Sequence, residues 1–431
     1  MRSRLSRTFA RQSPLSRRPN GRLPGNRPGG GPLGRDFRRL WLAATVSNVG
    51  DGITVVATPL LVAALTADPA LVAGAAFVTQ LPWLLFALIS GAFADRWDRR
   101  RTIVVVNVLR GVILAAVAAA VATGMITVAL LYLAGFLLGS LETLVDSATE
   151  AILPAIVADR QLERANAWLM IPFVVGNQMA AKPLGAYLFV LGAAIPFGVD
   201  ALSFLVAAML LTSIRPRGGG VPSPHQSRPG LRLEVAEGLR GLWSRSVLRT
   251  MALCLCLGNV LFCAAFASFV LYAQQRLGLS EVGFGTILSI WAGGGLVGTL
   301  LAPRLHARFG SGTLLRAGLI IEVGTHAVLA VTRAPAVAAA ILVLFGVHTM
   351  VWGVLIQSLR QRLVPDHLRG RVGSVFSLLN LGGAAIGTLA GGILAKATDL
   401  TTPFWFAAAG MAALTIAVWP RFSNEALTVQ P

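Results

Sequence analysis

The feature that most constrains this chain is a series of long apolar blocks, each about as long as a bilayer is thick. An α-helix rises 1.5 Å per residue, so about 20 apolar residues cross the roughly 30 Å hydrocarbon core of a membrane. Hydrophobic residues make up 55% of the 431 residues and charged residues only 13%, and the mean hydropathy is +0.71. Soluble domains carry about 25% charged residues. The twelve blocks cover residues 40–66, 70–93, 102–123, 126–152, 165–190, 193–214, 250–275, 282–303, 312–332, 335–359, 371–395 and 402–420. We therefore predict an all-α integral membrane protein with twelve transmembrane helices.

Polar segments divide these blocks into two sets of six. Residues 1–39 hold eleven arginines among Pro, Gly, Ser and Asn, a composition that predicts disorder. The segment LRLEVAEGLRGLWSRSVLR (231–249) repeats leucine and valine at helical spacing between charges, which is typical of an amphipathic helix on a membrane surface. The predicted organisation is a tail (1–39), a first six-helix half (40–214), a linker with the amphipathic helix (215–249), a second half (250–420) and a tail (421–431).

The positive charge of the chain predicts its orientation. The net charge is +19, and most arginines lie in links on the side of the N-terminus, with few in the links on the other side. Arginine-rich links remain in the cytoplasm, so we predict a multi-pass protein of the bacterial inner membrane with both termini cytoplasmic. This placement indicates contact with anionic lipid rather than with nucleic acid.

Motifs for enzymatic chemistry are missing from the sequence. It contains no GxxxxGK[ST] phosphate-binding loop, no HExxH and no metal-spaced set of Cys and His. Its three cysteines fall within one apolar block, which suits buried side chains rather than a disulfide framework. We predict no enzymatic activity, no cofactor and no metal.

Several segments in the expected order resemble the major facilitator superfamily. The link GAFADRWDRRRT (91–102) resembles the signature between its second and third helices. ETLVDSATEAILPAIV (142–157), FGVDALSFL (197–205) and SLRQRLVPDHLRGRVGSVFSLL (358–379) resemble its drug-exporter branch, which includes macrolide and siderophore exporters. The resemblance implies two pseudo-symmetric six-helix halves and alternating access. In the fifth span, Ala181-Lys182-Pro183-Leu184-Gly185-Ala186 stands in place of the glycine-rich antiporter motif, with a lysine where a glycine is usual.

The signature link is predicted to act as a latch between the halves. Gly91 allows close helix approach, and Asp95 can accept hydrogen bonds from the positive end of a neighbouring helix. The resemblance names that neighbour as the eleventh span, which opens near Gly370 and Arg371. Asp95 with Arg99 is then expected to stabilise the outward-facing state. The alternative is that the arginines Arg96, Arg99, Arg100 and Arg101 only anchor the loop to anionic lipid.

Charged residues inside the predicted spans are candidates for function, because an ionisable group in hydrocarbon is costly unless it is paired or solvated. In one interpretation they form ion pairs: Arg110 with Glu142 or Asp146, Lys182 with Asp200, and Glu322 with His348. In the other they handle protons. Asp51 and Asp146 suit this role best, since the first span offers Asp51 no obvious basic partner, and His348 is a further candidate.

Phe173, Trp291, Trp352 and Phe376 are candidates for an apolar substrate pocket, and the alternative for each is packing in the core or against lipid.

The resemblance implies a secondary-active exporter of small hydrophobic or amphipathic compounds, such as a drug, antibiotic or siderophore, working by proton antiport. Its partners are predicted to be the substrate, protons and the bilayer, and the protein is predicted to be a monomer. Two alternatives are a lysophospholipid or metabolite permease of the same fold, and a membrane sensor that transports nothing.

Overall fold

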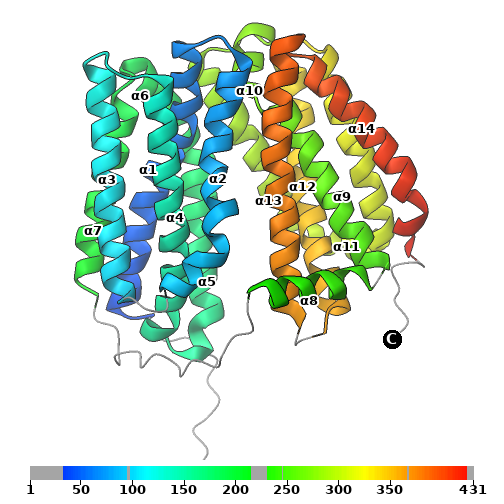
Figure 1. Ribbon diagram of the computed structural model, residues 1–431, viewed down its shortest axis with the longest axis horizontal. Helices are drawn as coiled ribbons and strands as arrows, with labels where there is room; N and C mark the ends of the chain where they lie inside the picture. The colour runs from blue at the N-terminus through cyan, green and yellow to red at the C-terminus, as the bar shows by residue number, and fades with distance from the viewer. Residues whose placement is uncertain (1–32, 95–97, 215–230, 245, 366–367, 425–431) are drawn as a thin grey trace, which may run out of the picture. The chain divides into compact units, whose positions relative to one another are not determined.

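The computed structural model describes residues 33–94, 98–214, 231–244, 246–365 and 368–424, which belong to one compact unit, Leu33–Pro431. These residues form helices and contain no strand (Figure 1). Ten of the described helices are long and apolar enough to cross a membrane. They are α1 (Arg35–Leu65), α2 (Pro69–Ala94), α3 (Arg99–Ala122), α4 (Val128–Ile156), α7 (Ile195–Thr212), α9 (Ser246–Phe266), α11 (Glu281–Val331), α12 (Pro335–Leu363), α13 (Arg369–Ala397) and α14 (Thr402–Val418).

Two irregular segments account for the remaining spans. The 51 residues of α11 contain a break at Gly310, whose φ of 75° lies in the left-handed region, so that this element contains the eighth and ninth spans. The fifth span is divided into α5 (Leu162–Ile171), a π-helix η2 (Pro172–Ala180) and α6 (Ala181–Leu191). π-helical turns are rare and are frequent at functional sites. With these two segments the twelve predicted spans are present.

Some helix ends differ from the sequence prediction. The first helix begins at Arg35, so residues 35–39 are helical, while residues 1–32 lie outside the described residues. The amphipathic helix α8 (Leu231–Trp243) ends six residues before the predicted boundary, and α9 begins at Ser246. At the other end of the chain, the short helix η5 (Trp419–Phe422) buries Phe422 in the core.

Small residues let the helices approach each other closely. An added Cβ on Gly185 of α6 would lie 2.6 Å from the backbone oxygen of Ile53 in α1. An added Cβ on Gly298 of α11 would lie 2.4 Å from the backbone oxygen of Val347 in α12. Such glycines serve as contact surfaces between membrane helices, where packing rather than a hydrophobic driving force holds the helices together.

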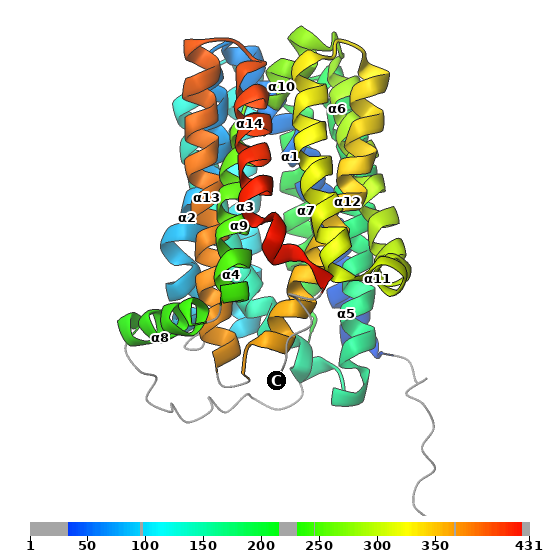
Figure 2. The same ribbon diagram turned by 90° about the vertical axis from the view of Figure 1, so that its right-hand side faces the viewer.

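The two sets of six spans form two halves that meet where α2 contacts α13 and where α6 and η2 contact α11 (Figure 1). The helix α8 lies crosswise at one end of the bundle (Figure 2), and we call this end the α8 end. At the opposite end, Lys396 Nζ of α13 lies 2.6 Å from Asp68 Oδ2 in the link between α1 and α2. Ser268 Oγ also donates to the backbone oxygen of Pro69 at 3.2 Å. These contacts join the halves at the end away from α8.

Candidate functional site

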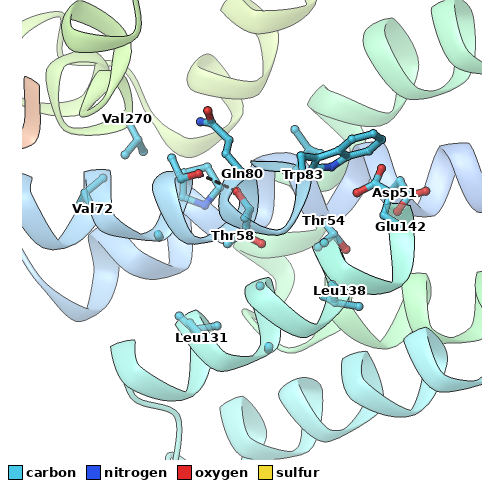
Figure 3. Close-up of a pocket in the computed structure, with 18 of the residues that line it drawn as sticks. Asp51, Thr54, Thr58, Val72, Gln80, Trp83, Leu131, Leu138, Glu142 and Val270 are labelled. Atoms are coloured by element: carbon cyan, nitrogen blue, oxygen red, sulfur yellow. Dashed lines mark hydrogen bonds between the residues drawn. The ribbon is translucent and has the colours of Figure 1, made fainter. Parts of the chain in front are cut away.

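A central cavity of about 960 Å³ is lined by helices of both halves (Figure 3). Its walls are largely apolar and aromatic, with Trp83 and Phe204 from the first half and Phe266 and Trp291 from the second. Among these walls lie a few polar side chains, chiefly Asp51, Thr54, Gln80, Arg110, Glu142, Asp200 and Asn380. An apolar cavity with a few convergent polar groups is the usual form of a small-molecule site.

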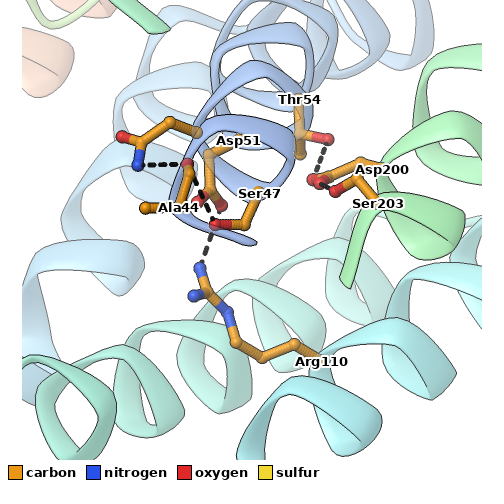
Figure 4. Close-up of polar contacts among 8 residues, drawn as sticks. Ala44, Ser47, Asp51, Thr54, Arg110, Asp200 and Ser203 are labelled. Atoms are coloured by element: carbon orange, nitrogen blue, oxygen red, sulfur yellow. Dashed lines mark hydrogen bonds and ion pairs between the residues drawn. The ribbon is translucent and has the colours of Figure 1, made fainter. Parts of the chain in front are cut away.

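One polar contact in this cavity is an ion pair between α1 and α3. Arg110 Nη2 lies 3.0 Å from Asp51 Oδ1 (Figure 4). The guanidinium carbon stands 4.1 Å from the centre of the Phe204 ring. The Arg110 side chain is 8% exposed and that of Asp51 is 29% exposed. The expectation that Asp51 lacks a basic partner is therefore wrong.

The two acidic residues of α4 that were expected to pair with Arg110 differ in their surroundings. Glu142 lines the central cavity within electrostatic range of Arg110, and the ion pair of Arg110 in the structure is with Asp51. Asp146, one turn further along α4, is exposed and is not among the residues that line this cavity. The structure thus brings Asp51 and Glu142 beside Arg110 in the cavity, whereas Asp146 lies outside the cavity lining but still within electrostatic range of Arg110 and Glu142.

Asp200 on α7 is held by hydroxyl groups rather than by a lysine. Its carboxylate accepts hydrogen bonds from Thr54 Oγ1 at 2.6 Å and from Ser203 Oγ at 3.0 Å (Figure 4). An added Cβ on Gly50 would lie 2.2 Å from the same carboxylate, so the approach of α1 to α7 at this point requires glycine. The predicted Lys182–Asp200 pair is wrong, because Lys182 Nζ donates to Gln178 Oε1 at 2.8 Å within its own span.

Lys182 and its neighbours form a contact surface between the halves. An added Cβ on Gly285 of α11 would lie 2.6 Å from the backbone oxygen of Lys182. Ser289 Oγ of α11 donates to the backbone oxygen of Met179 at 2.8 Å. The antiporter-like segment with Pro183 and Gly185 therefore lies between α1 on one side and α11 on the other.

The predicted contact of Glu322 with His348 is confirmed, since His348 Nε2 lies 3.2 Å from Glu322 Oε1. Both residues line a second cavity of about 230 Å³ in the second half. Of the aromatic candidates, Trp291 lines both cavities, Trp352 lines the second, and Phe376 is buried in the core. The described residues contain no group of three or more His, Cys, Asp or Glu that could hold a metal ion.

The residues of the predicted latch are only partly described. Asp95 and Arg96 lie outside the described residues, and Gly91 and Arg99 lie at the facing ends of α2 and α3. Arg100 donates to the backbone oxygen of Thr212, which belongs to the same half. In the second half, Arg371 forms an ion pair with Glu237 of α8, and Gly370 beside it is exposed.

Sequence reasoning did not single out two polar residues, Asp98 and Glu237. Asp98 caps the start of α3 by accepting a hydrogen bond from the backbone N–H of Arg101 at 2.8 Å, a role that an aspartate directly before a helix signals. Glu237 could have been identified only as a charge on the amphipathic helix, because its arginine partner lies far along the chain.

Two six-helix halves around a shared central cavity define a membrane transporter of the major facilitator type. The chain belongs to the family described as transmembrane secretion effector, which it matches over residues 31–425. It is 30% identical to the multidrug efflux pump Tap of Mycobacterium tuberculosis over 390 residues, which are 85% of this chain and 88% of Tap. It is 25% identical to the enterobactin exporter EntS of Salmonella typhimurium over 372 residues, 85% of this chain and 87% of EntS.

The fold is also similar to that of a solved structure, a bacterial homologue of the iron transporter ferroportin in its inward-facing state. The TM-score is 0.72 at 19% identity, over 91% of this chain and 99% of that chain.

Proposed function

We propose that the protein exports small amphipathic compounds across the bacterial inner membrane by alternating access, driven by proton antiport. The central cavity carries this proposal, because it is large, mostly apolar, lined by both halves, and contains a carboxylate paired with a guanidinium. The relatives named for multidrug efflux and for enterobactin export support a drug or siderophore as the substrate class.

The Asp51–Arg110 pair suggests how a proton and a substrate compete. Asp51 is accessible from the cavity, whereas Arg110 is almost fully buried behind it. A proton on Asp51 removes its charge and releases Arg110 toward the neighbouring carboxylates of Glu142 and Asp200. The polar wall of the cavity then changes its charge distribution without any substrate. A coupling ion that shifts the balance between two such arrangements shifts the population of the two transport states.

Export rather than uptake is proposed from the relatives named for efflux and for export, and the orientation of the chain is proposed from its charge. The arginine-rich links lie on the side of the N-terminus, which places both termini and α8 in the cytoplasm. One chain supplies all the walls of the central cavity, so we propose that the transporting unit is the monomer.

The proposal is tested by proton movement in liposomes. The purified protein is reconstituted with a pH-sensitive dye inside, a pH gradient is imposed, and cationic, neutral and anionic compounds are added in turn. We expect substrate-dependent proton movement in the wild type and its loss in Asp51→Asn. The matched control is Asp36→Asn on the same helix, whose carboxylate bonds Arg39 near the start of α1.

Other outcomes separate the proposal from its alternatives. Uptake of labelled substrate with no proton movement would refute antiport and favour a permease, with lysophospholipid as the first compound to try. Binding of a compound without any transport would favour a sensor.

A further inference from the structure

The second cavity lies apart from the Asp51–Arg110 pair and has its own charge. It occupies about 230 Å³ among α9, α11, α12 and α14, and it shares Phe262 and Trp291 with the central cavity. A compound in the central cavity could therefore extend one end past these two rings into the second cavity.

Glu322 is the acidic residue of this second cavity, and no described lysine or arginine lines it. The Glu322 side chain is 17% exposed. A carboxylate has about four lone-pair sites. Here Oε1 has His348 Nε2 as its partner, and Oε2 is buried without a hydrogen-bond partner, so lone pairs remain for a further donor.

The tautomer of the second histidine beside Glu322 follows from its contacts. His326 Nδ1 lies 2.7 Å from the backbone oxygen of Glu322, and since a carbonyl only accepts, Nδ1 is the donor. In the neutral ring Nε2 is then an acceptor, and it is buried without a partner. Because no described lysine or arginine lines the cavity, Glu322 has no permanently charged partner there.

The other walls of the second cavity are aromatic. The Phe262 and Phe345 rings are stacked with centroids 5.5 Å apart, and Phe345, His348 and Trp352 continue the row at 6.0 and 5.8 Å. Aromatic faces attract organic cations, more strongly where the cation is desolvated. An unneutralised carboxylate among aromatic rings suits an ammonium or amidinium group on an apolar body.

We infer that the second cavity binds the cationic group of an amphipathic substrate and that Glu322 is its counter-ion. The inference rests on the proposed function, since it names the substrate class of that transporter. The central cavity then holds the apolar body of the substrate, and the acidic site that recognises its charge lies in the opposite half from the Asp51–Arg110 pair.

The experiment compares two ligands of nearly the same shape, the primary ammonium 2-phenylpropan-2-ylammonium and uncharged tert-butylbenzene, in equilibrium binding to the purified full-length protein. We expect Glu322→Gln to weaken binding of the cation by about tenfold, as loss of a charged hydrogen-bond partner would. Binding of tert-butylbenzene should change less than about twofold, within the range of an unaltered apolar contact. Glu322→Asp, which keeps the charge, should retain most of the preference for the cation.

Three results would overturn the inference: unchanged cation affinity in Glu322→Gln, equal loss of both ligands in that variant, or loss of the cation preference in Glu142→Gln instead. The binding assay needs no transport. Charge-selective binding at Glu322 without export would count against the proposed function alone, and export with no effect of Glu322→Gln would count against this site alone.

Discussion

The two single changes that break the Asp51–Arg110 pair should together cost more stability than the removal of both charges in one variant. Removal of one partner of a buried ion pair costs about 3–5 kcal/mol, because the other charge is left without compensation, whereas replacement of both is often near neutral. Arg110 is 8% exposed, and its Nε is buried without a hydrogen-bond partner. Arg110 is therefore the buried member of the pair, and the cost of an uncompensated buried charge applies to it.

The two single changes should differ in size. Arg110 also lies within electrostatic range of Glu142 and Asp200, which still compensate its charge in Asp51→Asn, so we expect a cost on the order of 2 kcal/mol. Arg110→Gln removes the cation that these carboxylates share and also the contact with the Phe204 ring, so its cost should reach about 3 kcal/mol. The double variant no longer leaves Asp51 charged without a cation, but it still lacks the cation shared by Glu142 and Asp200 and the contact with Phe204. Its cost should therefore be about 2 kcal/mol, well below the sum of the two single costs.

The free energy of unfolding is measured by titration with SDS in mixed micelles for all four proteins, so that the coupling energy follows from the double-mutant cycle. Proton-coupled transport should be lost in the double variant as it is in Asp51→Asn. If the two single costs simply add in the double variant, the pair is not a unit and the argument from its burial fails.

Three further changes test the helix contacts. Lys396→Glu should make a cysteine introduced in place of Thr58, which lines the central cavity, react faster with thiol reagents added from the end opposite α8. Adding Asp68→Lys should restore protection. The hydrogen bond from Lys396 lowers the pKa of Asp68 below the ordinary aspartate value of 3.8. The contact is therefore present at a pH above 3.8, and it is lost as the pH falls through the lowered pKa of Asp68. Gly391→Ala places a Cβ 2.1 Å from a backbone oxygen of α9, so it should lower the free energy of unfolding in SDS titration by about 1–3 kcal/mol. The control is Gly382→Ala on the same helix, whose Cβ meets open space and should leave the free energy of unfolding unchanged. Glu237→Gln removes the ion pair between α8 and α13 and should speed limited proteolysis of α8.

Each of these three has an outcome that contradicts it. Equal accessibility of the central cavity to thiol reagents in Lys396→Glu and the wild type would mean that the Lys396–Asp68 contact does not hold the halves together. Equal stability of Gly391→Ala and Gly382→Ala would mean that α9 and α13 can separate without loss. An unchanged proteolysis rate in Glu237→Gln would mean that apolar packing alone fixes α8.

The spans and the class of the protein could be predicted from the sequence because hydropathy is a local property. Transfer of apolar side chains from water to lipid depends on the residues of one block and not on its neighbours, so twelve blocks predict twelve spans. The Glu322–His348 contact was also predictable, since the ninth and tenth spans are consecutive and antiparallel, and the two residues lie at similar depth.

Only the tertiary structure decided which of the remaining charges meet. Arg110 lies on α3 and Asp51 on α1, two helices that both pack against α7, and the long arginine side chain reaches across to α1. Depth along the helices allowed Glu142, Asp146 and Asp51 equally as partners of Arg110. The π-helical fifth span likewise sets the direction of Lys182, whose amine bonds within its own span rather than to Asp200. A sequence states how deep a side chain lies in the membrane, whereas the order and rotation of the helices determine what it faces.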